Sequence, residues 1–165
     1  MIKISLFNTT DSTGGAGRAA YRIHKAMRSI GVDSTMYSNI PKTGDWTVSG
    51  PDTKIKKGLG FIRGHLGSMV ASLQSTTNPI LHSPAILPSR WAKRINNSDI
   101  DIAHLHWVNA DMMSIHDIGL INKPLVWTLH DMWAFCGAEH LSNDNRWYDG
   151  YSRNNRPKHE SGLDI

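Results

Sequence analysis

The chain has little cysteine, no long apolar run and no signal-peptide pattern in its first residues, and each absence argues against a class of protein. Cys136 is the single cysteine among 165 residues, so neither an internal disulfide nor a zinc site built on several cysteines can form. No run of about 18 apolar residues is present to span a membrane. The start "MIKISLF" lacks the apolar stretch and cleavage site of a signal peptide. We therefore expect a cytoplasmic protein.

The remaining composition is that of an ordinary globular domain. Apolar residues make up 39% and charged residues 19% of the chain, which argues against global disorder. With 165 residues and no visible internal repeat, the chain is expected to form a single domain over residues 1–165.

Positive charge is unevenly placed along the chain. The net charge is only +4, yet Lys54, Lys56, Lys57 and Arg63 lie in one stretch without an acidic residue. Such a stretch attracts nucleic acid, anionic lipid or anionic substrates, and the simpler interpretation is a solvated helix face. Of these partners we expect no nucleic acid, and the other interpretations stay open.

Apolar segments alternate between strand-like and helix-like spacing. "IKISLF" reads as a buried first strand, the apolar positions from Ala16 to Ile30 follow helical spacing, and Gly31 stands where a helix end favours a left-handed residue. We expect further strands at residues 32–38, 46–49, 99–109 and 123–135, and further helices at residues 58–73, 89–95 and 111–122. The last of these strands is expected to be buried, and irregular structure should follow Gly137. This alternation predicts an α/β fold, a parallel sheet with helices on both faces.

A glycine-rich corner, "GGAGR", follows the first expected strand. Its residues Gly14, Gly15, Gly17 and Arg18 would let the backbone approach an anion closely, with the free N–H groups of the next helix and one cationic side chain nearby. The corner is neither the "GxGxxG" dinucleotide fingerprint nor a Walker loop. A tight strand-to-helix turn without a ligand is the competing interpretation.

Histidines cluster where two later strands should end, at the sheet edge where open α/β folds bind ligands. "HLHW" places His104 and His106 on one face of a strand, because side chains alternate with period two. With His130, Asp131 and His140 they could hold a metal ion, and the simpler interpretation is one buried and one site-lining histidine. "TLHD" places His130 where it could donate to a substrate hydroxyl or stabilise developing charge, and a purely structural histidine is the alternative.

Three segments together resemble a known family. "GGAGRAAYRIHKAMRSIGVDSTM", "DIAHLHWVNADMMSIHDIG" and "KPLVWTLHDMWAFCGAEH" are similar to the N-terminal domain of family 4 glycosyltransferases, most of all to the bacterial exopolysaccharide (colanic-acid type) branch. The resemblance covers nearly the whole chain, most weakly between residues 44 and 97. It implies one Rossmann-like half of a GT-B enzyme, which transfers a sugar from a nucleotide-sugar donor to a glycan or lipid-linked acceptor with retention of anomeric configuration.

The resemblance also implies roles for individual residues and no cofactor or metal. Gly14 and Gly15 would face the donor diphosphate, and His130 matches the active-site histidine that contacts the donor sugar. The basic stretch at residues 54–63 would contact the inner face of a membrane that carries the acceptor. The other expected residues of the diphosphate-facing loop or the cleft are Gly17, Arg18, His106 and Asp131.

Family members run well beyond this length, because a nucleotide-sugar domain follows. We therefore expect that the chain, as a truncated product, a fragment or half of a split enzyme, transfers little sugar alone. Three functions stay open at this stage: a glycosyltransferase N-terminal domain, a glycan-binding module without turnover, and a metal-dependent hydrolase built on His104, His106 and His130.

Overall fold

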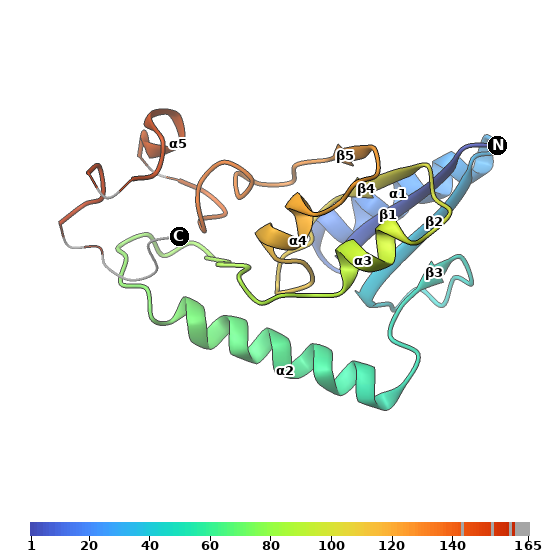
Figure 1. Cartoon of the computed structure of the whole chain (residues 1–165), viewed down its shortest axis with the longest axis horizontal. Coiled ribbons are helices and arrows are strands. Elements are labelled where there is room, and N and C mark those ends of the chain that lie inside the picture. The colour runs from blue at the N-terminus through green and yellow to red at the C-terminus, as the bar shows by residue number, and fades with distance from the viewer. Residues whose placement is uncertain (143, 153, 159, 161–165) are drawn as a thin grey trace.

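The computed structural model describes residues 1–142, 144–152, 154–158 and 160, with the side chain of Lys56 left out. Within these residues one five-stranded sheet, parallel throughout, has the strand order β3-β2-β1-β4-β5 (Figure 1). The strands are β1 (Lys3–Thr10), β2 (Asp33–Ile40), β3 (Val48–Ser49), β4 (Ile102–Leu105) and β5 (Leu125–Trp127). The helices are α1 (Gly14–Ser29), α2 (Lys54–Ala71), α3 (Trp91–Asn96), α4 (Ile115–Gly119) and α5 (Arg146–Asp149). The predicted Rossmann-like α/β fold is confirmed.

Helix α1 covers one face of the sheet. Leu6 of β1 and Met36 of β2 are fully buried against Ala20 of α1. They share a face because β1 and β2 pair with Leu6 opposite Met36. Gly31 follows α1 with a φ of 84°, as expected for the residue that ends a helix in the left-handed region.

Helices α3 and α4 cover the opposite face, toward the viewer in Figure 1. Phe7 is the neighbour of Leu6 in β1 and therefore points to this side, where it packs with Leu105 of β4 and Ile95 of α3. Its ring stacks on Tyr37 at 5.3 Å and meets Trp91 edge-on at 5.5 Å. Adjacent apolar residues in β1 thus fill two separate cores, and the expected cover on both faces is confirmed.

The expectation that the last strand is buried is wrong. β5 is the edge strand of the described sheet, and its consecutive residues Leu125 and Val126 are 41% and 47% exposed. Because consecutive strand residues point to opposite faces, neither face of β5 is fully covered by the described residues. Only Trp127 packs, partly buried, against the core of Phe7 and Leu105.

All five helices differ from the sequence prediction: α3 and α4 have other bounds, α5 lies where irregular structure was expected, and α1 and α2 begin elsewhere. Helix α1 begins at Gly14, so the glycine corner forms its first turn, and α2 begins at Lys54 rather than at Gly58. Helix α2 lies along one side of the molecule, apart from the sheet (Figure 1). Arg63 holds it there by donating to the backbone carbonyls of Asp111 and Leu87. None of the described helices is both long and apolar enough to cross a membrane.

Candidate active site

The carboxyl ends of β1, β4 and β5 meet at one edge of the sheet. Beyond the paired strands the chain stays in register, because the amide N–H of His106 donates to the Phe7 carbonyl at 2.9 Å and that of Thr128 to the Leu105 carbonyl at 2.9 Å. The amide N–H of Thr9 likewise donates to the Trp107 carbonyl at 2.9 Å. The strand before the glycine turn and the two histidine segments therefore belong to one edge, as the sequence predicts.

Two histidine contacts join the ends of β4 and β5. His106 Nδ1 lies 2.9 Å from His130 Nε2, and His104 Nε2 lies 2.8 Å from Thr128 Oγ1. A hydrogen bond between two imidazole nitrogens needs one donor and one acceptor, so at least one ring of the first pair is neutral. His106 is 2% exposed and its Nε2 has no hydrogen-bond partner among the described residues. The hydrogen bond with His106 therefore holds the ring of His130, which is less buried, in place through one of its two nitrogens.

Burial keeps these imidazoles neutral. Burial, with smaller contributions from the neighbouring His104 and His130, lowers the pKa of His106 to about 3. Burial also lowers the pKa of His130, against an opposing effect of the Asp131 carboxylate. A neutral His130 can donate a hydrogen bond to a substrate oxygen without bringing a full charge into the site.

Asp131, the next residue, forms its hydrogen bonds with other side chains and with the backbone of the loop after β5. Its Oδ2 accepts from the indole N–H of Trp107 at 2.9 Å and lies 2.5 Å from His140 Nδ1. Its Oδ1 accepts from the amide N–H of Trp133 at 3.1 Å. The carboxylate thus organises the loop after β5, a role that sequence reasoning, which placed it in the cleft, did not foresee. The sequence groups His140 with Asp131 as possible metal ligands, whereas the structure joins the two directly; Trp107 was missed as a partner because only the fold brings it to Asp131.

The glycine turn occupies the start of α1. Gly14, with a φ of 72°, and Gly15 are exposed, as is Arg18, while Gly17 is buried against the end of β1. Thr13 precedes the helix and makes no side-chain capping bond to its first turn. The N–H groups at the start of a helix and the positive end of its dipole favour an anion, and the anion-binding loop stays a prediction.

Two alanine substitutions test how tightly this turn is packed. We expect Gly17→Ala to lower the free energy of unfolding by about 1–3 kcal/mol, the usual cost of overpacking. The added methyl would lie 2.5 Å from Thr10 Oγ1 and 3.2 Å from the Thr10 carbonyl oxygen. Gly15→Ala should be neutral or raise it by up to ~1 kcal/mol, as for a helical glycine, because nothing lies within 4 Å of its added methyl. Urea unfolding measures the free energy of unfolding of both variants. Equal changes in the two variants would contradict the tight packing described for Gly17.

The metal-site interpretation gains no support from this geometry. His104 and His106 each use one nitrogen in a hydrogen bond, to Thr128 and His130, and His140 uses both, to Asp131 and Ser83. In the part of the chain that the structure describes, no group of three or more histidine, cysteine, aspartate or glutamate side chains is arranged to hold a metal ion.

Comparison with known proteins identifies the family. The sequence profile of Glycosyltransferase Family 4 matches residues 13–159, which include the glycine turn and the whole histidine edge. The chain belongs to glycosyltransferase family 4. No match was found among curated proteins or among solved structures.

Membership in glycosyltransferase family 4 indicates which substrates the sheet edge formed by β1, β4 and β5 would meet. The substrates of such enzymes are a sugar donor and an acceptor, and the expected family resemblance is confirmed at that level. The fold agrees with the N-terminal half of a GT-B glycosyltransferase. In this context His130 and the glycine turn are the residues to test first.

Proposed function

We propose that this chain is the acceptor-side domain of a retaining glycosyltransferase that uses a nucleotide sugar to build a bacterial cell-surface polysaccharide of the colanic-acid type. The observation that carries the proposal is His130, hydrogen-bonded to buried His106 at the edge where the glycine turn follows β1. Family membership supplies the reaction class.

The chemistry follows from charge. Breaking the bond between the sugar and the diphosphate leaves negative charge on the departing phosphate and positive charge on the sugar ring. Backbone N–H groups at Gly14 and Gly15, with Arg18 beside them, stabilise the phosphate. His130 donates a hydrogen bond to the donor sugar. No cofactor or metal takes part in these steps, and the nucleotide sugar is a substrate.

The donor requires a second binding surface. The described residues form one sheet, so we propose that a second Rossmann-like domain, supplied from outside these residues, holds the nucleotide. A transition state that is stabilised from two sides loses most of its stabilisation when one side is removed. The alternative is a domain that binds a glycan without turnover. If sugar transfer appears when a donor-binding domain of a related enzyme is added, the glycosyltransferase proposal is supported. Binding of the acceptor without sugar transfer would favour the glycan-binding alternative.

Helix α2 is the proposed contact with an anionic membrane at the cytoplasmic face. Apolar side chains point into solvent along its length although it begins with basic residues, a pattern typical of helices that lie on a membrane surface. The exposed large apolar residues of the helix are Ile55, Leu59, Phe61, Ile62, Leu66 and Met69. The acceptor would then be lipid-linked.

Charge reversal tests this contact. Replacing Lys54, Lys56 and Lys57 by glutamate should weaken binding to vesicles rich in phosphatidylglycerol by at least about 100-fold, since each basic residue near an anionic surface contributes about 1 kcal/mol. Vesicle co-sedimentation measures the effect.

The control reverses three exposed basic residues elsewhere on the surface: Arg22, Arg90 and Lys93. This variant has the same net charge as the first and should keep most of the binding. If both variants bind as the unaltered chain does, or lose binding equally, the proposed role of α2 is wrong.

A further inference from the structure

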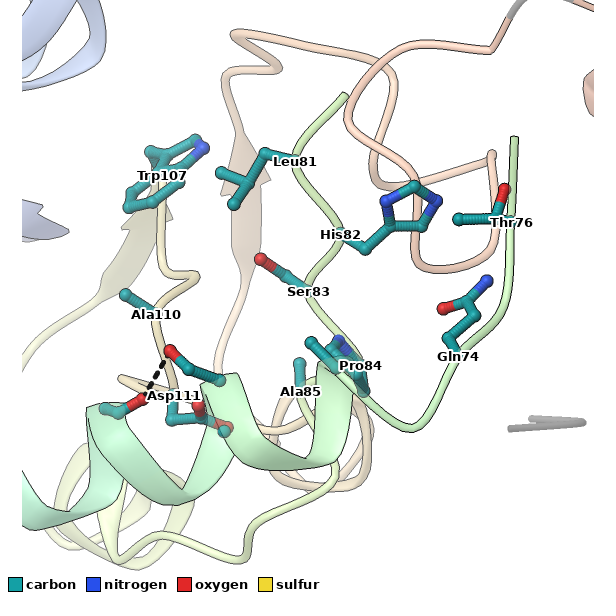
Figure 2. A pocket seen from close by; sticks show the side chains of 14 residues that line it. Gln74, Thr76, Leu81, His82, Ser83, Pro84, Ala85, Trp107, Ala110 and Asp111 are labelled. Atoms are coloured by element: carbon teal, nitrogen blue, oxygen red, sulfur yellow. Dashed lines mark hydrogen bonds between the residues drawn. The ribbon is translucent and has the colours of Figure 1, made fainter. Parts of the chain in front are cut away.

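A cavity of 360 Å³ lies between α2 and two loops, within the range of small-molecule sites (Figure 2). Its walls come from residues 64–71 of α2, from residues 81–85 and from the segment after β4 that includes Trp107. Three lining residues, Ala85, Ala110 and Asp111, have φ values of 48°, 51° and 56°. Left-handed backbone at residues other than glycine costs free energy and clusters at functional sites.

Ser83 projects from the wall on the Trp107 side of its segment, while His82 points to the opposite side (Figure 2). The backbone of Ser83 is held on both sides. Its amide N–H donates to the Ala138 carbonyl at 2.8 Å, and its carbonyl accepts from Trp133 Nε1 at 2.8 Å. Its hydroxyl oxygen lies 2.8 Å from His140 Nε2. The hydroxyl therefore has a fixed position and a basic nitrogen within hydrogen-bond reach.

His140 is oriented for proton transfer. Its other nitrogen, Nδ1, lies 2.5 Å from Asp131 Oδ2, and the indole N–H of Trp107 donates to the same oxygen. A carboxylate in this place keeps the proton on Nδ1 and leaves Nε2 free to accept the proton of Ser83. The ring is 6% exposed and lies between Trp107 and Trp133, with centroids 5.6 Å and 6.5 Å away.

We propose that Ser83, His140 and Asp131 form a nucleophilic serine centre that accepts acyl groups from small neutral esters bound in the cavity. The chemistry of this centre does not use His130, although Asp131 is the residue next to it. The same constellation occurs on unrelated folds and is recognised by its geometry rather than by its order in the chain. Here the order is serine, aspartate, histidine.

The reaction balances with water as the only co-reactant. Ser83 Oγ attacks the ester carbonyl carbon while its proton moves to His140 Nε2, and the Asp131 carboxylate stabilises the imidazolium. The bond to the alcohol then breaks, and the alcohol leaves with the proton from Nε2. Water attacks the acyl-serine, its proton passes through Nε2 to Ser83 Oγ, and the carboxylic acid is released.

The polarity and charge of the residues that line the cavity indicate which esters would bind there. Ala71, Leu81 and Pro84 offer an apolar wall to a short acyl chain. The Asp111 carboxyl, 9% exposed at the same wall, disfavours a negatively charged ester. A small neutral ester, such as an O-acetyl group on an alcohol or a sugar, satisfies both conditions.

The competing account is a structural clasp. His82 and Glu139 form an antiparallel β-bridge, and the backbone amide N–H of His140 donates to the Leu81 carbonyl at 3.1 Å. The triad residues therefore also connect the segment around Ser83 to the segment around His140. A clasp stabilises the fold without making Ser83 reactive. A reactivity measurement therefore distinguishes the two accounts.

The test uses a fluorophosphonate probe, which forms a covalent bond with activated serine hydroxyls, on the purified 165-residue chain. We expect one adduct per chain, located on Ser83 by peptide mass spectrometry, and hydrolysis of p-nitrophenyl acetate with a burst of about one equivalent of p-nitrophenol. His140→Gln should slow labelling by at least about 100-fold, and Asp131→Asn by up to the order of 10,000-fold through the wrong tautomer.

The controls separate reactivity from folding. Ser83→Ala should remove the adduct and keep the circular dichroism spectrum. Ser72→Ala, which alters an exposed serine that donates to the Met69 carbonyl, should label as the unaltered chain does. A folded, unaltered chain that gains no adduct on Ser83 overturns the proposal, and so does labelling that persists in His140→Gln. Neither result bears on sugar transfer, which rests on His130.

Discussion

Replacing His130 by alanine should reduce sugar transfer by about 100- to 10,000-fold, the range for a side chain that stabilises charge or transfers a proton in the transition state. The assay combines the chain with a donor-binding domain and follows labelled sugar from a nucleotide sugar into the acceptor. Because His130 is held by His106 at the site edge and lies outside both buried core clusters, the variant should fold. The loss should appear mainly in kcat, since the interaction strengthens as charge develops.

The matched control is His116→Ala. His116 is an exposed histidine on α4, on the side of the sheet away from α1, and its removal should change transfer by less than about 2-fold, as surface substitutions do. A His130→Ala variant that keeps its melting temperature and at least a third of its transfer rate would contradict the assigned role.

Acid should destabilise the fold by several kcal/mol between pH 7 and pH 5. Burial lowers the pKa values of His24, His104, His106 and His130, and that of His106 reaches about 3. Below the ordinary histidine pKa of about 6.5 the unfolded chain binds protons that the folded chain does not, so stability falls as pH falls. Each fully shifted histidine contributes up to about 1.4 kcal/mol per pH unit in this window.

Urea unfolding at pH 7, 6 and 5 measures this slope. The variant His106→Asn should show a slope shallower by about 1 kcal/mol per pH unit, because one buried titrating group is removed. The carboxylates with lowered pKa values lose their favourable contacts only below about pH 4 and do not affect the window; they are Asp11, Asp45, Asp99, Asp117 and Asp144. Burial raises the pKa of Asp111, which acts against the histidines and offsets part of the slope. Equal stability at pH 7 and pH 5 would show that the histidines are not buried as described.

Local rules predict the first half of the sheet and the histidine edge well. The apolar run "IKISLF", the helical spacing after it and Gly31 identify β1 and α1 because each depends on neighbouring residues only. The convergence of His106 and His130 at one edge follows from the same rules, whereas their hydrogen bond is seen only in the structure. Side chains of His104 and His106 share a face, and parallel strands place the ends of β4 and β5 side by side.

The rest depends on contacts between distant residues, which sequence patterns do not show. Leu125 and Val126 have the composition of a buried strand, yet β5 lies at the edge of the sheet and exposes both. Ser83 and His140 are 57 residues apart, and no spacing signal connects them. Gly67 reads as a helix-weakening residue, whereas a methyl group there would lie 1.4 Å from Asp111 Oδ2, so the glycine leaves room for this carboxylate.

The same limit applies to α2. The sequence predicts a helix here although its glycines weaken it, but only the structure shows that large apolar side chains on it face solvent. An amphipathic pattern is satisfied equally by a core or by a membrane surface. The solvent exposure of these side chains therefore supplies the information that the sequence pattern lacks, because it shows that they do not face a core within the described residues.

The most direct test of the central claim is transfer itself. Labelled sugar from a panel of nucleotide sugars is followed into a lipid-linked or oligosaccharide acceptor, with this chain, with a donor-binding domain of family 4, and with both together. We predict labelled product from the combination only, for at least one donor. If the two folded domains form a complex and none of the donors gives product, or if the donor-binding domain gives the same product alone, this chain is not the acceptor-side half of a glycosyltransferase.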